Sequence, residues 1–316
     1  MFQWKQLKSA GESTRSYSLD SFPLRPRLPL PAGISRQALF DWVRTVRVAD
    51  APDSISQYCD QDFERFVHTL GLVQHASASS NGSKIGLELG ANPYFTTMLL
   101  RQFTSIEWRL ANYFGTQLPT GDAIQRVFVD PFGSREPRTH IDFSYSHFNI
   151  EEDTYPFETC SFDIVLFCEI IEHLLNDPCK VLREIRRVLN DGGTLVLTTP
   201  NVNRLENVAR MIAGANIYDP YSGYGPYGRH NREYNKHELY HLLNYLGFTV
   251  EEIFTADVNP NLSANYLDLT KFGPLIDYRK HDLGQYIFVR ARKSGVDQGK
   301  KPAWLYRSYE PAQLDD

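Results

Sequence analysis

The sequence of 316 residues has little of three features that would assign it to a protein class at once. No apolar run approaches the length of about 18 residues that a membrane-spanning helix needs, and the first residues lack the apolar core of a signal peptide. The four cysteines include no C-x-x-C pair, which argues against a zinc ribbon and against a disulfide scaffold. The charge is not positive either, since 33 Lys and Arg against 38 Asp and Glu give −5. We therefore expect a cytoplasmic protein that has no membrane span and does not bind nucleic acid through a basic surface.

The composition that is present, with 42% hydrophobic and 22% charged residues, is that of a globular chain. Residues 1–34 are rich in Pro, Arg and Ser, which predicts a surface arm. Residues 35–80 combine apolar positions at helical spacing with the beginning of a linker-like run of Ala, Ser, Asn and Gly at 76–83. We expect the main domain to span 81–293 and a tail to follow over 294–316.

Strands and helices alternate after the linker. The run FDIVLFC at 162–168 is apolar throughout, as in a strand that is buried on both faces. Asp177-Pro178 has the chemistry of a helix start, an apolar stripe follows, and Gly192-Gly193 is expected to end that helix. The alternation predicts a Rossmann-like α/β fold, with a doubly wound, mostly parallel sheet and an N-terminal helical segment. The expected strands are 84–89, 106–112, 125–130, 141–148, 162–168, 194–199, 248–254 and 285–290, and a further helix is expected over 96–103.

A glycine turn, Glu88-Leu89-Gly90-Ala91-Asn92-Pro93-Tyr94, follows the first of these strands. Ligands of open α/β sheets bind beyond the carboxyl ends of the strands, so this turn is a candidate binding site. Asn92 and Phe95 stand where the dinucleotide fingerprint has its other glycines, which argues against a bound pyrophosphate. Glu88 suits an ammonium or a sulfonium group instead, and Asn112 at the next strand end suits ribose hydroxyls. The alternative is a junction that binds no ligand.

The turn at 88–94, together with the run SFDIVLFCEIIEHLLNDPCKVLREIRRVLNDGGTLVLTTPN at 161–201, resembles the class I S-adenosylmethionine-dependent methyltransferases. The shared features are the fourth strand, the E-x-x-E-H turn, the helix opened by D-P, the R-V-L-x-x-G-G turn and the strand that ends in T-P-N. The resemblance covers residues 84–292 and implies S-adenosylmethionine as cofactor and an in-line attack on its sulfonium methyl group. Asn112 and Asn149 stand where the family usually has acidic residues. The cofactor-binding residues that the resemblance implies are Glu88, Gly90, Ala91, Asn92, Asn112, Asn149, Ile150, Cys168 and Glu169.

Glu169, Glu172 and His173 form an E-x-x-E-H motif, and His230 lies in a later R-H-N-R-E-Y run. On a helical turn the first three would share one face. Two carboxylates and two imidazoles suit a divalent cation such as Mg, Mn or Zn, which would lower the pKa of an acceptor hydroxyl. The arrangement is similar to that of small-RNA 3′-end ribose 2′-O-methyltransferases and of O-methyltransferases of ubiquinone biosynthesis.

Two alternatives to this metal site stay open. Without a metal, His173 or His230 would act as the general base, and these two histidines with Glu169 are the candidate catalytic residues. In the simplest case, Glu172 and His173 would only cap and pack their turn.

The segment 214–235 contains five tyrosines and four glycines and follows the strand that ends in T-P-N. Tyrosines offer flat faces and hydroxyls to a sugar, and glycines allow a segment to move as a lid. The segment with its R-H-N-R-E-Y core resembles methyltransferases of surface-polysaccharide and glycan pathways, which implies a sugar hydroxyl as acceptor. A packed surface loop is the alternative.

These observations predict an enzyme that moves a methyl group from S-adenosylmethionine to a hydroxyl oxygen of a sugar, another small molecule or a glycan intermediate. The N-terminal helical segment is expected to cap the active site. A metal-dependent RNA ribose 2′-O-methyltransferase and a non-catalytic binder of adenosyl ligands stay open as alternatives, and so does the oligomeric state. A zinc hydrolase is suggested only by His237-Glu238-Leu239-Tyr240-His241, which matches H-E-x-x-H. The leucine stripe of that segment favours a packed helix instead.

Overall fold

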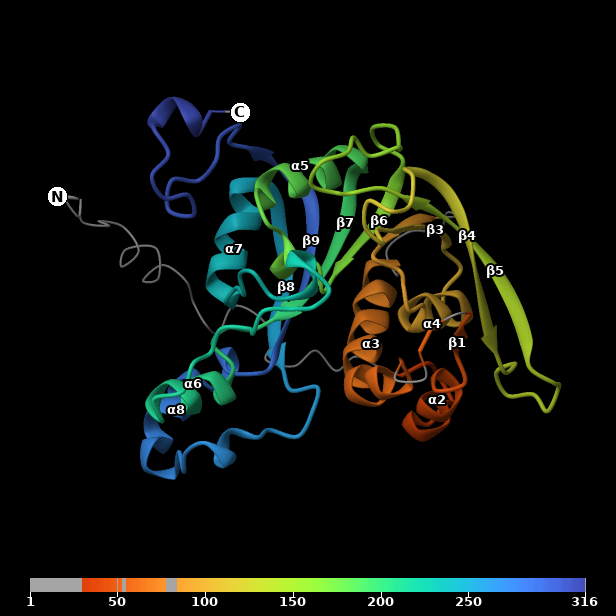
Figure 1. Ribbon diagram of the computed structural model, residues 1–316, viewed down its shortest axis with the longest axis horizontal. Helices are drawn as coiled ribbons and strands as arrows, with labels where there is room; N and C mark the ends of the chain where they lie inside the picture. Colours follow the sequence, from red (N-terminus) through yellow and green to blue (C-terminus); the bar gives the residue numbers. More distant parts are fainter. Residues whose placement is uncertain (1–29, 50, 53–54, 78–83, 316) are drawn as a thin grey trace.

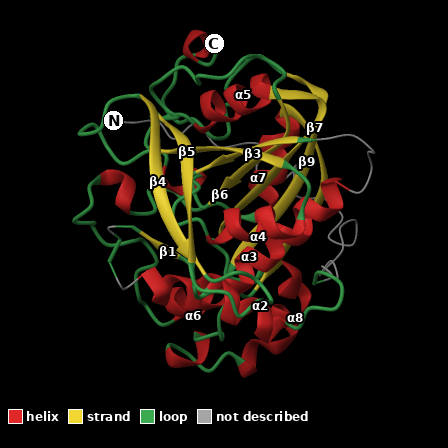
Figure 2. Ribbon diagram, turned by 90° about the vertical axis from the view of Figure 1, so that its right-hand side faces the viewer, coloured by secondary structure: helices red, strands yellow, loops and turns green. Residues whose placement is uncertain are grey.

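A computed structural model describes residues 30–49, 51–52, 55–77 and 84–315. These residues form a nine-stranded sheet in the order β1-β4-β5-β3-β2-β6-β7-β9-β8, with helices on both faces (Figures 1 and 2). The strands are β1 Arg47–Val48, β2 Ile85–Leu89, β3 Glu107–Asn112, β4 Gly121–Val129, β5 Thr139–His147, β6 Phe162–Cys168, β7 Leu189–Pro200, β8 Leu246–Ala256 and β9 Tyr286–Asp297. The α-helices are α2 Arg36–Val43, α3 Ile55–Ser77, α4 Phe95–Phe103, α5 Pro178–Val188, α6 Leu205–Ile212, α7 Lys236–Tyr245 and α8 Gly273–Arg279.

The middle of the sheet is parallel and its two sides are antiparallel. The five neighbouring strands β5, β3, β2, β6 and β7 pair in parallel. The strands β4 and β1 continue the sheet on one side and β9 and β8 on the other, all through antiparallel pairs. The predicted Rossmann-like α/β fold is confirmed, with the parallel strands as its central block. The loosely predicted strands at 125–130 and 141–148 form a long hairpin of β4 and β5, which projects beyond the helices in Figure 1.

Two apolar cores hold the helices against opposite faces of the sheet. On one face α2, α3 and α4 pack through buried side chains such as Phe66 and Leu99. On the other face α5 and α7 pack through buried side chains such as Ile185 and Leu242. Burying a side chain of this size contributes about 1.5–3 kcal/mol. The two cores therefore fix the sheet from both sides, as the doubly wound prediction requires.

Helix α5 begins where the sequence predicts and ends earlier. Asp177 caps the first turn by accepting hydrogen bonds from two backbone amides, and Pro178 follows at the first helical position. The helix ends at Val188, because Leu189 already pairs with β6. Gly192-Gly193 does not end the helix; it lies in an irregular part of β7, where the register with β6 shifts.

The N-terminal segment contains the two expected helices and also a strand that was not expected. Arg47–Val48 forms β1 between α2 and α3 and pairs with β4. Helix α3 continues to Ser77, so the first two residues of the predicted linker are helical. The rest of the linker, 78–83, and most of the predicted arm, 1–29, lie outside the described residues. Within the described residues, no helix has the length and apolar character to cross a bilayer.

The carboxyl ends of the parallel strands meet at one edge of the sheet. The pairs of Pro200 with Tyr286 and of Tyr286 with Ala256 place the ends of β7 and β8 and the start of β9 at this edge. The segment 257–285 therefore leaves from this edge and returns to it, and α6 and α8 lie together there in Figure 1. Segments between the strands therefore lie around the carboxyl edge, which is where open α/β sheets bind their ligands.

Candidate functional site

The turn after β2 is fixed by its own hydrogen bonds. The amides of Gly90 and Ala91 both donate to the carbonyl of Ala111 in β3, at 2.8 and 3.2 Å. The amide of Asn92 donates to Oδ1 of Asn112 at 2.8 Å, and Nδ2 of Asn112 donates to a tyrosine hydroxyl at 3.0 Å. Gly90 has φ +69°, a backbone conformation that favours glycine. Asn112, which the sequence predicts as a ribose contact, therefore also ties the turn to the neighbouring strand.

Glu88 is the buried carboxyl at the end of β2. It is 5% exposed, and its Oε2 accepts a hydrogen bond from Oγ1 of Thr97 at 2.6 Å. Burial raises the pKa of Glu88 to about 8, although the Thr97 hydrogen bond opposes the shift. A cation that enters beside Glu88 would favour its ionised form, so the residue suits the ammonium group that the sequence analysis expects there.

Two adjoining cavities lie at the carboxyl edge. The first has a volume of about 180 Å³ and lies beside the ends of β3 and β6. The second has a volume of about 190 Å³ and lies between the glycine turn and α3. Gly90 and Glu169 line both cavities, so the two cavities are direct neighbours. All nine residues predicted to bind the cofactor line one cavity or both, namely Glu88, Gly90, Ala91, Asn92, Asn112, Asn149, Ile150, Cys168 and Glu169.

Helix α3 contributes two cavity residues that the sequence analysis did not identify, Tyr58 and Arg65. A signal for them was present in the sequence. Asp62, Arg65 and Thr69 recur at helical spacing within a segment that is otherwise rich in apolar residues, and all three are less than 9% exposed. A polar stripe on a buried helix face indicates either a buried ion pair or a binding surface. Helix α3 of the N-terminal segment thus lines the second cavity, and the capping of an active site by this segment stays a prediction.

Glu169 does not share a helical face with the rest of the E-x-x-E-H motif, contrary to the sequence-based expectation. Its backbone has φ +55°, and the single helical turn η2 (Ile171–His173) begins only after it. Thr198 donates to Oε1 of Glu169 at 2.8 Å, and Nε of Arg65 lies 4.0 Å from the same oxygen. Burial raises the pKa of Glu169. Its carboxyl group therefore belongs to the cavity wall, and the predicted four-residue cluster has three members.

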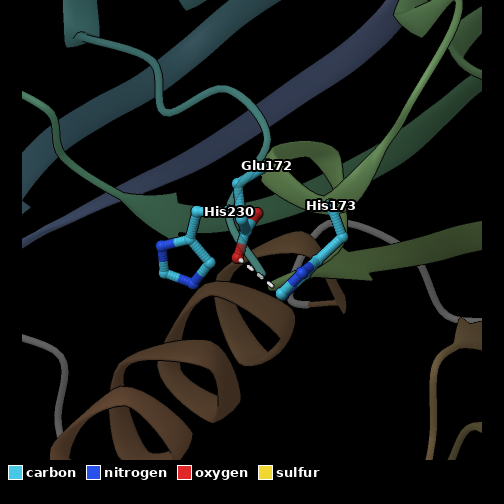
Figure 3. Close-up of side chains that lie close together, drawn as sticks. All are labelled: Glu172, His173 and His230. Atoms are coloured by element: carbon cyan, nitrogen blue, oxygen red, sulfur yellow. Dashed lines mark ion pairs between the residues drawn. The ribbon is translucent and has the colours of Figure 1, made fainter. Parts of the chain in front are cut away.

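Glu172, His173 and His230 converge from η2 and from the segment 214–235 (Figure 3). One ligand atom from each lies within 4.8 Å of the others, and the two imidazole centroids are 5.0 Å apart. Glu172 is fully buried, and its Oε2 accepts a hydrogen bond from Thr199 at 2.8 Å. Its Oε1 has no hydrogen-bond partner among the described residues and lies 3.8 Å from Nε2 of His173. An unpartnered carboxylate oxygen at full burial is costly unless a ligand completes it.

Both imidazoles are oriented through Nδ1. Nδ1 of His173 lies 2.9 Å from the carbonyl oxygen of Arg229, and Nδ1 of His230 lies 2.8 Å from Oε1 of Glu233. Arg204 donates to the other carboxylate oxygen of Glu233. A proton on Nδ1 that is donated to these oxygens leaves Nε2 with its lone pair. Burial lowers the pKa of His173, whereas Glu233 and other acids outweigh burial and raise the pKa of His230.

The segment that carries His230 is fastened to η2. The amides of Asn231 and Arg232 both donate to the carbonyl of Glu172, at 2.7 and 3.1 Å. The side-chain amide of Asn231 donates to the carbonyls of His173 and Pro226, each at 2.9 Å. The three hydrogen bonds to Glu172 and His173 explain how residues more than fifty positions apart in the sequence form one cluster, whereas the bond to Pro226 lies within the segment.

The five tyrosines of the segment 214–235 have three different environments. Tyr227 lines the first cavity, and its hydroxyl accepts a hydrogen bond from Nδ2 of Asn149 at 3.2 Å. Tyr234 is buried in the core. Tyr218, Tyr221 and Tyr224 are each more than 80% exposed. Of the five, only the exposed three therefore present faces to a large ligand, and Tyr227 belongs to the wall of the first cavity.

The H-E-x-x-H match belongs to a packed helix. Glu238 is paired with Arg232, and Nε2 of His237 lies 3.3 Å from Oδ2 of Asp282. Leu239, Leu242 and Leu243 of the same helix are fully buried. Among the described residues, the group of His, Cys, Asp and Glu that fits a metal ion does not include His237 or His241. The geometry of this helix therefore does not support the zinc-hydrolase alternative.

Comparison with known proteins identifies a methyltransferase domain. A family model of that description matches residues 72–253, more than half of the chain. No curated protein matches the sequence. Similar solved structures include a methyltransferase in complex with the Haloferax volcanii Trm112 methyltransferase activator, with 17% identity, 81% of this chain and 97% of that chain covered and a TM-score of 0.45. A SAM-dependent methyltransferase from Archaeoglobus fulgidus has 15% identity, coverage of 75% and 99% and a TM-score of 0.44. The CurJ carbon methyltransferase has 15% identity, coverage of 77% and 59% and a TM-score of 0.45.

Proposed function

The chain belongs to the methyltransferase domain family, and from this premise we propose that it transfers the methyl group of S-adenosylmethionine to a hydroxyl oxygen of a sugar or glycan intermediate. One observation carries the choice of oxygen. His173 lines the first cavity and His230 stands beside it, and both have Nδ1 occupied and Nε2 directed away from those contacts. A hydroxyl acceptor must lose a proton during the transfer, and imidazole is a suitable general base near neutral pH.

The residues of the two cavities would bind different parts of the methyl donor. Asn112, Asn149 and Ile150 would bind the adenosine end, Glu88 would face the ammonium group, and Glu169 would lie near the sulfonium. S-adenosylmethionine supplies an electrophilic methyl group. The site aligns the acceptor oxygen with the methyl carbon, so that the new O–C bond forms as the C–S bond breaks and its electron pair stays on sulfur. His173 or His230 takes the hydroxyl proton at Nε2.

The cluster of Glu172, His173 and His230 also fits a divalent cation. The buried, unpartnered Oε1 of Glu172 and two imidazole nitrogens are a donor set that suits Zn or Mn better than Mg. A cation held there would lower the pKa of the acceptor hydroxyl and orient it. Metal analysis of the purified protein, and activity after chelation and after readdition of Mn, Zn or Mg, test this part. Full activity of a metal-free sample would leave the histidines as bases.

The acceptor is proposed from the surface around the cluster. Tyr218, Tyr221 and Tyr224 are exposed aromatic faces in the segment that carries His230, and the Arg229 guanidinium lies 4.9 Å from the ring centroid of Tyr221. Such faces suit the apolar side of a sugar ring. An RNA ribose 2′-hydroxyl is the second candidate acceptor, and it is favoured by the metal-binding geometry of the cluster and disfavoured by the net charge of −5. A cytoplasmic location stays a prediction.

Isothermal titration with S-adenosylhomocysteine tests the donor site first. We expect micromolar binding, which corresponds to about −8 kcal/mol. The loaded protein is then tested for transfer of a labelled methyl group to sugars, nucleotide sugars, phenols and RNA 3′ ends. Transfer to a sugar supports the proposal, and transfer only to RNA replaces it with the second candidate. Binding without transfer to any acceptor favours a non-catalytic adenosyl binder, and no binding by the folded protein contradicts the proposal.

A further inference from the structure

Arg65 is a buried cation in the wall of the second cavity. It lies in α3 and is 3% exposed. It lines the cavity opposite the glycine turn, and it is the only cationic side chain among the described residues that line it. Burying a charge is costly unless the charge has partners, so a guanidinium at this position needs an explanation.

The guanidinium group is oriented by protein contacts, but one of its nitrogens takes part in no hydrogen bond among the described residues. Its Nε donates to Oδ1 of Asp62 at 2.9 Å, and its Nη2 donates to the hydroxyl of Tyr58. The rings of Tyr58, Phe66 and Tyr286 lie 4.9–5.9 Å from its central carbon. No hydrogen bond among the described residues uses Nη1. The side chain is therefore oriented before a ligand arrives, which reduces the entropy lost on binding.

The glycine turn, by contrast, has no backbone donors left for an anion. The amides of Gly90, Ala91 and Asn92 donate to β3, and the amide of Tyr94 donates to the carbonyl of Ala91 at 2.7 Å. Pro93 has no amide hydrogen. A carboxylate that enters this cavity must therefore find its hydrogen bonds outside this turn. The start of α4 also lines the cavity, but Arg65 is the cationic side chain among the described lining residues.

We propose that Arg65 binds the carboxylate at the amino-acid end of the methyl donor. The proposal rests on the proposed function, because that end of the donor carries one ammonium and one carboxylate. Glu88 and Arg65 line the same cavity and present opposite charges to these two groups. Guanidinium groups pair well with carboxylates because their N–H groups form a planar fork. Arg65 would thus fix the orientation of the donor as well as its affinity.

The test compares two ligands that differ only in this carboxylate. Titration calorimetry measures the affinities of S-adenosylhomocysteine and of its decarboxylated analogue for the full chain and for Arg65→Met. We expect the full chain to bind S-adenosylhomocysteine about ten- to a hundredfold more tightly than the analogue, as for a hydrogen bond to a charged group. In Arg65→Met this ratio should fall close to one, because only the ligand with the carboxylate loses its partner.

Two control variants separate the possible causes. Arg290→Met removes a half-buried, doubly ion-paired arginine of β9 that lines neither cavity, and it should leave the ratio unchanged. If Arg65→Met does not fold, because Asp62 is left buried without its partner, Asp62→Asn combined with Arg65→Met removes the pair together. A ratio near one in the wild type, or an equal loss for both ligands in the variant, overturns the proposal. If the wild type binds neither ligand, the proposed function itself fails.

Discussion

The proposed donor side, around the glycine turn 88–94, and the proposed acceptor side, around η2, differ in how fully their polar groups are hydrogen-bonded. Around the glycine turn, the amides of Gly90, Ala91 and Asn92 already have protein partners. Around η2, by contrast, Oε1 of Glu172 lacks a hydrogen-bond partner among the described residues, and both imidazoles keep Nε2 away from their Nδ1 contacts. Satisfied groups give a rigid surface, and unsatisfied groups are available for chemistry. Under the proposed function, the first is a preformed binding surface and the second is a reactive one.

His230→Ala should give the largest effect and tests the reactive side. Loss of the general base, or of a metal ligand, should lower turnover about 10²- to 10⁴-fold, while the affinity for S-adenosylhomocysteine should change little. Steady-state kinetics and calorimetry on the same sample measure the two quantities. His140→Ala, on the exposed hairpin of β4 and β5, is the matched control. A larger loss of affinity than of turnover would place His230 on the donor side, and the proposed difference between the two sides would then be wrong.

Glu88→Gln tests the binding side. Replacing the carboxyl group by an amide of the same shape removes the charge that faces the ligand ammonium. We expect the affinity for S-adenosylhomocysteine to fall about ten- to a hundredfold. Glu184→Gln, on α5 and paired with Arg187, is a control far from the cavities. Unchanged affinity in Glu88→Gln would remove Glu88 from the site.

The same substitution predicts a pH effect on the free protein. Burial raises the pKa of Glu88 from 4.5 to about 8, so between these values the native state holds a proton that the unfolded state has lost. The contribution of Glu88 to stability is therefore fully present below pH 4.5, declines as the pH rises and levels off above pH 8. Thermal unfolding from pH 5 to 8.5 should show Glu88→Gln gaining melting temperature relative to the wild type as the pH rises. A difference that is independent of pH would mean that Glu88 is already ionised.

Tyr227→Phe should give the smallest effect and tests where the two sides meet. Tyr227 comes from the segment of the acceptor side, but its hydroxyl bonds to Asn149 of the donor side. Loss of one such hydrogen bond should weaken binding of S-adenosylhomocysteine about two- to tenfold. Tyr224→Phe, on an exposed residue of the same segment, should change nothing. Equal effects of the two variants would indicate that the Tyr227 hydroxyl has no special role in binding.

The sequence predicted the elements whose signals are local. The strand 162–168 and the capped start of α5 were found as predicted, because an uninterrupted apolar run and an Asp-Pro cap need no distant partner. The resemblance to a class I methyltransferase is confirmed by the family match and by the parallel core of the sheet. The end of α5 was misjudged, because pairing of Leu189 with β6, a tertiary contact, overrides the glycine signal.

The sequence predicted which residues gather at the carboxyl edge of the sheet, but not how they are arranged there. The nine predicted cofactor residues gather at two cavities, because the ends of parallel strands meet at one edge. Glu169 lies outside the cluster because its backbone has a left-handed conformation, which the residue pattern does not predict. The hydrogen bond of Asn112 to the glycine turn and the position of Arg65 beside Glu169 are contacts between segments that are distant in the sequence. Their roles in binding stay predictions.

Helix α3 has a consequence for how such proteins can be recombined. The match to the family begins at residue 72, inside this helix, whereas Tyr58 and Arg65 lie before that point and line the second cavity. A chimera joined at residue 72 would take Tyr58 and Arg65 from one parent and the glycine turn, which lines the same cavity, from the other. The part of the chain that matches the family model therefore leaves out two residues that line the cavity, so the borders of the matched domain and of the cavity lining differ.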